Sequence, residues 1–144
     1  IAAQRICPVL GRGSYMGIDR SPAAIKAAIA RNANYTKAGR AIFLEGAFNY
    51  ADREPALFDR ILAVNVNVFW NGEGAEVIDV RRLMHVKSVF VQVYEPPEAT
   101  QRAKIARILK KRLTPYFGNV TTKMHTVGGA SLLGVVATGE RPAP

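Results

Sequence analysis

The end of the chain carries the pattern that most restricts the possible folds. Two stretches, Asn119–Thr126 and Ala130–Thr138, have the residue types of β-strands, and only Val127-Gly128-Gly129 separates them. Parallel strands need a connection of about a dozen residues, usually a helix. The sequence therefore predicts that these two strands, if they pair directly, form an antiparallel hairpin.

Upstream of this hairpin, patterns typical of strands alternate with patterns typical of helices. The strands are expected at Tyr15–Ile18, Ala41–Leu44, Phe58–Val66 and Ser88–Tyr94. The helices are expected at Ala23–Ala30, Ala75–Leu83 and Thr100–Leu113, with a short one at Ile1–Ile6. The buried stripe of the helix at Thr100–Leu113 is expected to consist of Ile105, Ile108, Leu109 and Leu113. This alternation predicts an α/β fold with a mostly parallel sheet and helices on both of its faces. The hairpin adds an antiparallel end to that sheet.

The size and composition of the chain fit one globular core. It has 144 residues, of which 49% are hydrophobic. We therefore expect a single domain over residues 1–144, with a proline-rich tail at residues 139–144 that frays. The single cysteine, Cys7, excludes a disulfide framework. No apolar run approaches the roughly 18 residues of a membrane span, and no signal peptide is visible, so the expected location is the cytoplasm.

The net charge of +9 raises the question of an anionic partner such as nucleic acid. Most lysines and arginines are spread along the chain, and only Arg102–Arg112 forms a dense block. Aromatic side chains, which stack on bases in many nucleic-acid sites, are not interleaved in that block. Nucleic-acid binding is therefore an open alternative and not the favoured function.

The most informative polar residue is Asp19, which ends the first predicted strand. A carboxylate at the carboxyl end of such a strand lies at the ligand edge of an α/β sheet, where it can accept hydrogen bonds from both hydroxyls of a ribose. The alternative is that Asp19 caps the helix that follows. Ser21 already provides an N-cap hydroxyl, and Pro22 suits the first helical position. The ribose interpretation is therefore favoured.

Three segments and the closing hairpin resemble the class I S-adenosylmethionine-dependent methyltransferases, which have a Rossmann-like fold. Gly17–Asn32 is similar to the segment after the family's first strand–helix unit. Phe43–Ala47 and Phe58–Val66 are similar to its third-strand and fourth-strand motifs. The hairpin resembles the one that separates this fold from dehydrogenase-type Rossmann domains. The resemblance covers nearly the whole chain and implies methyl transfer from the cofactor S-adenosyl-L-methionine to an unidentified acceptor, expected to be a small molecule.

The resemblance also implies which residues contact the cofactor. They are Asp19 and Arg20 at the ribose, Gly46, Ala47 and Phe48 around the adenine, and Asn65 and Val66 beside the methionine end. Ala47 departs from the family pattern, which often has an acidic residue there to accept a hydrogen bond from the adenine amino group. A core position for Phe48 stays open as an alternative. So does a role for the Asn65 side chain in satisfying loop backbone.

Aromatic residues at the same sheet edge are candidates for the acceptor site, namely Phe69, Trp70 and Tyr94. Packing of Phe69 and Trp70 onto the next helix is the alternative. Glu95 is either a base or a solvated loop residue, and no catalytic residue is assigned. The segment Asn65–Val68 lacks the Asn/Asp-Pro-Pro-aromatic pattern of amino-directed nucleic-acid methyltransferases, which argues against a base-modifying enzyme.

No metal site is expected. The two histidines, His85 and His125, show no HxxH or HExxH spacing, and the single cysteine excludes a multi-cysteine zinc site. His85 is expected at the end of a helix, where its partial charge suits the dipole. His125 is expected within a strand, with a structural role.

The largest departure from the family is the missing glycine-rich loop that holds the methionine end of the cofactor. Gly11-Arg12-Gly13 lies too close to Asp19 to leave room for the intervening helix and strand. We therefore expect that the first strand and its loop are lacking and that Ile1–Ile6 is the tail of the first helix. Such a chain is expected to be inactive alone and to expose strand edges, through which it could form a homodimer.

Two other functions stay open. One is an NAD(P)-dependent Rossmann oxidoreductase, because a carboxylate at Asp19 suits a dinucleotide ribose equally well. The other is a basic, non-catalytic RNA or interaction domain that uses the helix of Arg102–Arg112.

Overall fold

The computed structural model describes residues 2–47, 57–96 and 98–139. Contacts within the chain divide it into two compact units, Ile1–Arg53 and Glu54–Pro144. The expectation of one domain over residues 1–144 stays a prediction. Of the tail that was expected to fray, residues 140–144 lie outside the described residues.

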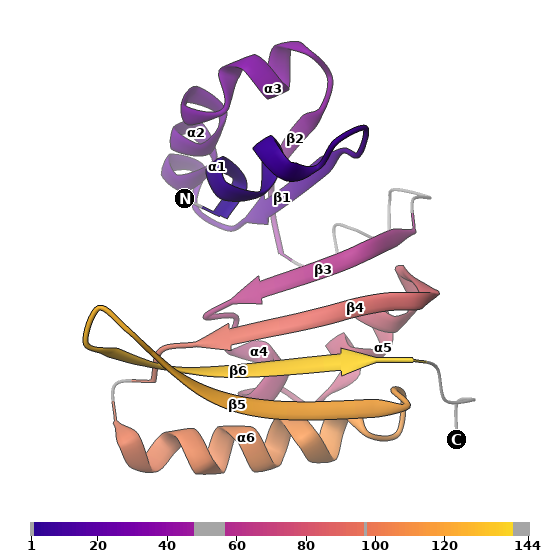
Figure 1. The fold of residues 1–144 in the computed structure, drawn as a ribbon, viewed down its shortest axis with the longest axis vertical. Helices are drawn as coiled ribbons and strands as arrows, with labels where there is room; N and C mark the ends of the chain where they lie inside the picture. Colours follow the sequence, from indigo (N-terminus) through magenta and orange to yellow (C-terminus); the bar gives the residue numbers. More distant parts are fainter. Residues whose placement is uncertain (1, 48–56, 97, 140–144) are drawn as a thin grey trace. The chain divides into compact units, whose positions relative to one another are not determined.

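The first unit contains a two-stranded parallel sheet with short helices (Figure 1). Its elements are α1 (Ala2–Ile6), the 3-10 helix η1 (Cys7–Val9), β1 (Tyr15–Asp19), α2 (Pro22–Arg31), α3 (Ala33–Lys37) and β2 (Ala41–Glu45). The register runs from Tyr15 opposite Ala41 to Asp19 opposite Glu45. The predicted strands and the helix after Ser21 are therefore confirmed. The Ser21 hydroxyl accepts a hydrogen bond from the Ala24 N–H at 3.2 Å, as an N-cap does.

Two aromatic rings pack against the small core of the first unit. The Tyr15 and Phe43 rings lie with their centroids 5.8 Å apart, next to the buried residues Ala3, Cys7 and Ala41. Gly17 permits this packing, because a Cβ there would come within 2.9 Å of the Phe43 ring. Burial also raises the pKa of the Cys7 thiol, so this cysteine is less reactive than a free one.

The second unit is a four-stranded sheet with helices packed against it (Figure 1). Its elements are β3 (Phe58–Val64), α4 (Val68–Asn71), α5 (Ala75–Arg82), β4 (Met84–Tyr94), α6 (Ala99–Leu113), β5 (Asn119–Val127) and β6 (Ala130–Thr138). The strand order is β3-β4-β6-β5, with β3 and β4 parallel and the other two pairs antiparallel. The predicted closing hairpin is confirmed, and so is the mixed α/β class.

Three phenylalanines from separate segments form the centre of the second core. Phe69 of α4 packs edge-on against Phe90 of β4, with centroids 5.3 Å apart, and Phe117 stacks on Phe90 at 6.3 Å. The apolar stripe predicted for α6 supplies Ile105 and Leu109 to the same core, and both are buried. Burial of this stripe, more than the propensity of the charged α6 sequence, stabilises the helix.

The boundaries of β3 and β4 differ from the predicted ones. β3 ends at Val64 instead of Val66, because Asn65 adopts a positive φ of 53° that interrupts the extended backbone. β4 begins at Met84 instead of Ser88. The expectation of His85 at a helix end is therefore wrong: α5 ends at Arg82, and His85 lies exposed within β4.

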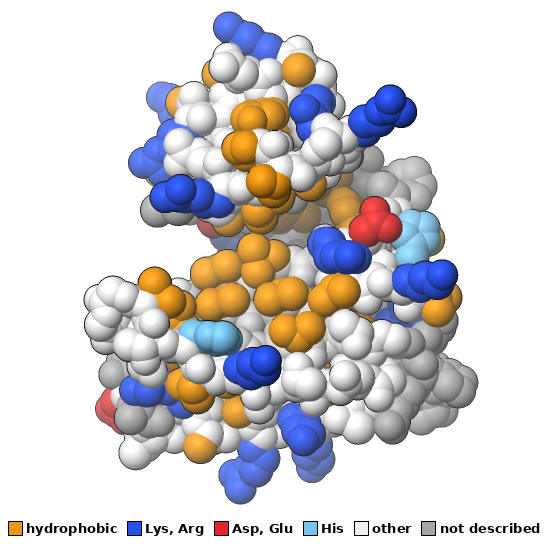
Figure 2. Space-filling model, in the orientation of Figure 1, with side chains coloured by type: hydrophobic (Ala, Val, Ile, Leu, Met, Phe, Trp, Pro, Cys, Tyr) orange, Lys and Arg blue, Asp and Glu red, His pale blue; other side chains and the backbone are white. Residues whose placement is uncertain are grey.

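The sheet of the second unit has one face that its helices do not cover. Alternate residues of each strand point to the same face, so the register places Leu62 and Val64 of β3 beside Val91 and Val93 of β4, and Val136 of β6 beside Val91. Leu62 and Val64 are 43% and 51% exposed. Figure 2 shows hydrophobic side chains gathered on this face. Within the described residues, β3 is also an edge strand of this sheet.

Candidate functional site

The first group of candidate residues lies at the carboxyl ends of β1 and β2. Asp19 and Glu45 are partners in the register, and the Gly46 N–H donates to the Asp19 carbonyl at 2.9 Å. Asp19 and Gly46, both expected at the cofactor, are thus brought together at one strand end. Arg20 is exposed beside them and Ala47 is half-buried, while Phe48 lies outside the described residues.

Asp19 contributes to the start of α2, which is the alternative considered for it from the sequence, and its ribose role stays a prediction. Its Oδ1 accepts a hydrogen bond from the Ser21 N–H at 2.8 Å, which helps to start α2. No hydrogen bond to its Oδ2 is formed within the described residues, and the side chain is exposed. A carboxylate has about four lone-pair positions, so this group keeps acceptor capacity for ligand hydroxyls.

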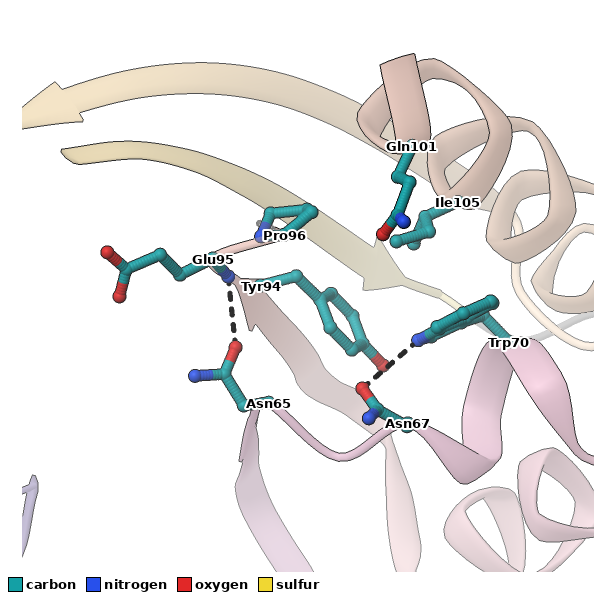
Figure 3. Close-up of a pocket in the computed structure, with 8 residues that line it drawn as sticks. All are labelled: Asn65, Asn67, Trp70, Tyr94, Glu95, Pro96, Gln101 and Ile105. Carbon is teal, nitrogen blue, oxygen red and sulfur yellow. Dashed lines mark hydrogen bonds between the residues drawn. The ribbon is translucent and has the colours of Figure 1, made fainter. Parts of the chain in front are cut away.

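The second group surrounds a pocket at the carboxyl ends of β3 and β4 in the second unit (Figure 3). The pocket has a volume of about 260 Å³. Its lining residues are Asn65, Asn67, Trp70, Tyr94, Glu95, Pro96, Gln101 and Ile105. Three segments that are distant in the sequence therefore meet here: the β3–α4 turn, the end of β4 and the start of α6. This is the sheet edge at which α/β folds bind their ligands.

Asn65 ties together the ends of the two parallel strands. Its N–H donates to the Val93 carbonyl at 2.9 Å, and its Oδ1 accepts from the Glu95 N–H at 2.9 Å. Asparagine tolerates the left-handed conformation that this position requires better than most residues do. The side-chain oxygen thus satisfies loop backbone, as the structural alternative for Asn65 expected, and the amide NH₂ group keeps its hydrogen-bonding capacity.

The Tyr94 phenol anchors the turn that follows β3. It donates to the Val66 carbonyl at 2.8 Å and lies 3.2 Å from Oε1 of the buried Gln92. A phenol has one hydrogen, so it cannot donate to both oxygens. With the Gln92 carboxamide turned over, its NH₂ group, otherwise without a partner among the described residues, would donate to the phenol oxygen. Burial raises the pKa of Tyr94, so the phenol stays protonated at neutral pH.

The three aromatic residues expected around the acceptor occupy different environments. Trp70 and Tyr94 line the pocket, and Trp70 Nε1 donates to Asn67 Oδ1 at 3.2 Å (Figure 3). Phe69 is only 1% exposed and packs against Phe90. Phe69 therefore packs in the core and is not among the residues that line this pocket, whereas Trp70, the next residue of α4, is.

Several pocket residues had no role assigned from the sequence. Asn67 reaches the pocket because the backbone turns at Asn65 and enters α4, a helix too short to be recognised from residue periodicity. Gln101 and Pro96 carry no sequence pattern that indicates a site. Ile105 was expected in the buried stripe of α6. It is buried there and also lines the pocket.

The basic block at Arg102–Arg112 is partly committed to contacts within the protein. Arg102 Nη1 donates to the Ser131 hydroxyl at 2.5 Å. Arg112 donates to the Phe69 carbonyl at 2.9 Å and to the Gly72 carbonyl. The exposed cations of the block are therefore the lysines and the arginine between its ends, namely Lys104, Arg107, Lys110 and Lys111. This reduces the charge available for a phosphate backbone.

Replacing Arg112 by alanine is expected to lower the free energy of unfolding by about 2 kcal/mol, because two carbonyls lose a charged donor. Urea unfolding followed by fluorescence of Trp70, the one tryptophan of the chain, measures this change. The adjacent Lys111→Ala is the control, since Lys111 is exposed, and we expect a change below about 0.5 kcal/mol. Equal effects of the two substitutions would show that the Arg112 contacts do not stabilise the unit.

The described residues contain neither a metal cluster nor a membrane-spanning helix. No group of three or more histidine, cysteine, aspartate or glutamate side chains is arranged to hold a metal ion in this part of the chain. His85 and His125 lie in different strands, β4 and β5. No helix of residues 2–47, 57–96 or 98–139 is long and apolar enough to cross a membrane.

Comparison with known proteins finds similarity at the level of structure. No protein-family model and no curated protein matches the sequence. A domain of a candidate precorrin-6Y C5,15-methyltransferase from Corynebacterium diphtheriae matches 95% of this chain and 81% of its own, with a TM-score of 0.66 and 16% identity. TrmN from Thermus thermophilus matches 95% of this chain over 40% of its own, with a TM-score of 0.70 and 18% identity.

A third solved structure points to the same fold. A candidate O-methyltransferase from Klebsiella pneumoniae matches 90% of this chain over 63% of its own, with a TM-score of 0.68 and 12% identity. The chain thus spans less than two thirds of this structure and of TrmN. Identities this low establish the fold and not the substrate. The chain has the fold of the class I S-adenosylmethionine-dependent methyltransferases.

Proposed function

We propose that this chain binds S-adenosyl-L-methionine and takes part in methyl transfer to a small-molecule acceptor. The observation that carries the proposal is the Asp19 carboxylate, which lies at the carboxyl end of a parallel strand. One of its oxygens is committed to the Ser21 N–H, and the other has no partner within the described residues. Such a carboxylate fits the two hydroxyls of a ribose.

The proposal assigns each part of the cofactor to residues of this chain. Asp19 and Arg20 would bind the ribose; Gly46, Ala47 and Phe48 would flank the adenine; and Asn65 and Val66 would lie beside the methionine end. The Asn65 amide NH₂ group, left over after its Oδ1 accepts from Glu95, fits a carboxylate or carbonyl of that end.

The acceptor would occupy the pocket lined by Trp70 and Tyr94. When bound, the cofactor supplies a methyl group on a positively charged sulfur, which is electrophilic without further activation. The chain then has to align the acceptor and exclude water, and no protein nucleophile is required. Tyr94 is unsuited to act as a general base, because burial raises its pKa and its proton is held by the Val66 carbonyl.

Thermal unfolding tests the proposal against the nicotinamide alternative. The sample is the chain with a β-strand and a glycine-rich loop, of the kind that the family resemblance implies, added before Ile1. We call this sample the extended chain. Saturating S-adenosylhomocysteine, at about 100 times its dissociation constant, should stabilise it by about 2.7 kcal/mol and raise Tm by several degrees. NAD⁺ should have no such effect. A larger shift with NAD⁺, or no shift with S-adenosylhomocysteine, would contradict the proposal.

We also propose that the 144-residue chain self-associates through the uncovered face and edge of β3. Leu62 and Val64 are exposed there, and within the described ranges β3 is an edge strand, which is a template for pairing with another chain. Light scattering at high protein concentration should give a dimer, and Leu62→Lys should shift it toward monomer. Val86→Lys, at a 61% exposed position of β4, is the matched control. A monomer at every concentration would rule out this association.

A further inference from the structure

We propose that the outer side of α6 binds the phosphate backbone of a nucleic-acid duplex. Lys104, Arg107 and Lys111 follow one another at spacings of three and four residues, so they lie on one side of the helix, opposite its buried stripe. All three are exposed, and Lys110 is exposed beside them. We call these four residues the α6 cation row. Figure 2 shows lysine and arginine side chains along the lower edge of the second unit, where Figure 1 places α6.

All charged side chains of α6 have the same sign. Its sequence, ATQRAKIARILKKRL, contains lysine and arginine but neither aspartate nor glutamate. Arg107 has a like-charged neighbour three or four residues away at Lys104, Lys110 and Lys111, and each such pair destabilises a helix. No ion pair to the α6 cation row is formed within the described residues. An anionic partner on this side of α6 would therefore offset a repulsion that this part of the chain leaves uncompensated.

The helix dipole accounts for only part of this charge pattern. Cations in the last turn of a helix are stabilised by its free carbonyls, and Lys110 and Lys111 lie there. Lys104 and Arg107 lie nearer the middle of α6, beyond the reach of that effect, which falls off within the last turn. Neither of these two side chains makes a hydrogen bond or an ion pair within the described residues. Neither the dipole nor any such contact therefore explains why these positions carry cations.

The side chains around the α6 cation row favour a phosphate backbone among anionic partners. Ala103 is the one apolar residue among the described residues of α6 that are exposed, so no large apolar side chain is available to insert into a lipid surface. The sequence of α6 contains no aromatic residue that could stack on unpaired bases. From Lys104 to Lys111 the helix rises about 10 Å, and one strand of a DNA duplex presents about three phosphates over that length.

The inference does not rest on the proposed function. Backbone contacts need neither the cofactor nor the pocket, although Gln101 and Ile105 of the same helix line that pocket. Contacts to phosphates carry no sequence information, so the duplex should be bound without regard to its base sequence. The duplex would be a further partner of the chain, and the proposed methyl acceptor stays a small molecule.

Fluorescence anisotropy of a labelled 20-base-pair DNA duplex, titrated with the 144-residue chain, tests the inference. Contacts with about three phosphates release about three counterions, so raising the salt concentration from 50 to 200 mM should weaken binding about 40-fold. The triple variant Lys104→Gln, Arg107→Gln, Lys111→Gln should bind at least about tenfold more weakly at 50 mM salt. Its affinity should also depend less steeply on salt, because fewer counterions are released.

The matched control is a second triple variant, Arg60→Gln, Lys87→Gln, Lys123→Gln. These three cations are exposed on strands of the same unit. Both triple variants replace one arginine and two lysines, so they lower the net charge equally. The control should keep its affinity for the duplex within about threefold of the unsubstituted chain and keep the same salt dependence. Circular dichroism of both variants shows whether they remain folded.

Four results would overturn the inference. Equal weakening by the two triple variants would mean that net charge alone attracts the duplex. Absence of duplex binding at 50 mM salt would remove the interaction itself. Tighter binding of the same DNA as a single strand would point to the bases, and tighter binding of vesicles that contain phosphatidylserine would point to a membrane surface. Because no cofactor is present, these outcomes are distinguishable from a failure of the chain to bind S-adenosylhomocysteine.

Discussion

Gly72→Ala is expected to lower the free energy of unfolding by about 3 kcal/mol. Gly72 follows α4, and its N–H donates to the Val68 carbonyl at 2.9 Å. A Cβ at position 72 would lie 2.5 Å from that same carbonyl oxygen, which belongs to the backbone and cannot rotate away. The Gly72 carbonyl also accepts from Arg112, so a shift of this turn would strain the link between α4 and α6.

The control for this substitution is another glycine of the same unit. Gly134→Ala, in β6, would place its Cβ 3.6 Å from the nearest atoms, which is an ordinary contact. We expect the free energy of unfolding to change by no more than about 0.5 kcal/mol in that variant. Urea unfolding monitored by Trp70 fluorescence compares the two. Equal stability of Gly72→Ala and Gly134→Ala would contradict the prediction, because it would mean that the backbone after α4 can move away from the new Cβ without a loss of stability.

Asp19→Asn is expected to weaken the binding of S-adenosylhomocysteine to the extended chain about 30-fold. The substitution keeps an oxygen for the Ser21 N–H, so the start of α2 should be preserved. It removes the charge and one acceptor, and hydrogen bonds to a charged group contribute about 1.5–3 kcal/mol each. Isothermal titration calorimetry measures the dissociation constant directly.

Asp59→Asn is the matched control for that titration. Asp59 is an exposed aspartate of β3, in the other unit, and none of the proposed contacts involves it. We expect its dissociation constant to stay within about twofold of the unsubstituted value. An unchanged affinity in Asp19→Asn would remove the ribose assignment while leaving the fold assignment intact.

The parts of the fold that the sequence predicted are those with local causes. The Gly-Gly connection after Val127 leaves room only for a hairpin, and Ser21 with Pro22 defines the start of α2 by hydrogen bonding and ring geometry. The stripe that includes Ile105 and Leu109 likewise follows from helical periodicity, and both residues are buried.

The remaining features depend on contacts between distant segments. β3 ends early because Asn65 adopts a positive φ, and that conformation is fixed by hydrogen bonds to Val93 and Glu95 on the next strand. β4 begins at Met84 because Met84 pairs with Phe58 of β3. The next three residues, including His85, are all exposed, so their burial does not alternate as it does along a typical strand. Tertiary pairing decides such positions over local preference.

The candidate pocket likewise combines residues that the local sequence predicted with residues that only contacts between distant segments bring together. Trp70 and Tyr94 were expected near an acceptor because Trp70 follows one predicted strand and Tyr94 ends the next, at one edge of the sheet, and both line the pocket. Gln101 reaches it from α6, and its sequence neighbours give no indication of that role. The orientation of the Asn67 carboxamide depends on its hydrogen bond with Trp70, and only the folded turn brings these two side chains together.

The most direct test of the account is a calorimetric titration of S-adenosylhomocysteine into two samples, the 144-residue chain and the extended chain. The account predicts saturable binding to the extended chain and binding at least about tenfold weaker to the chain alone. The reason is that the family resemblance implies a glycine-rich loop at the methionine end, and Gly11-Arg12-Gly13 lies too close to Asp19 to be that loop. No binding to either sample, with tighter binding of NAD⁺, would contradict it.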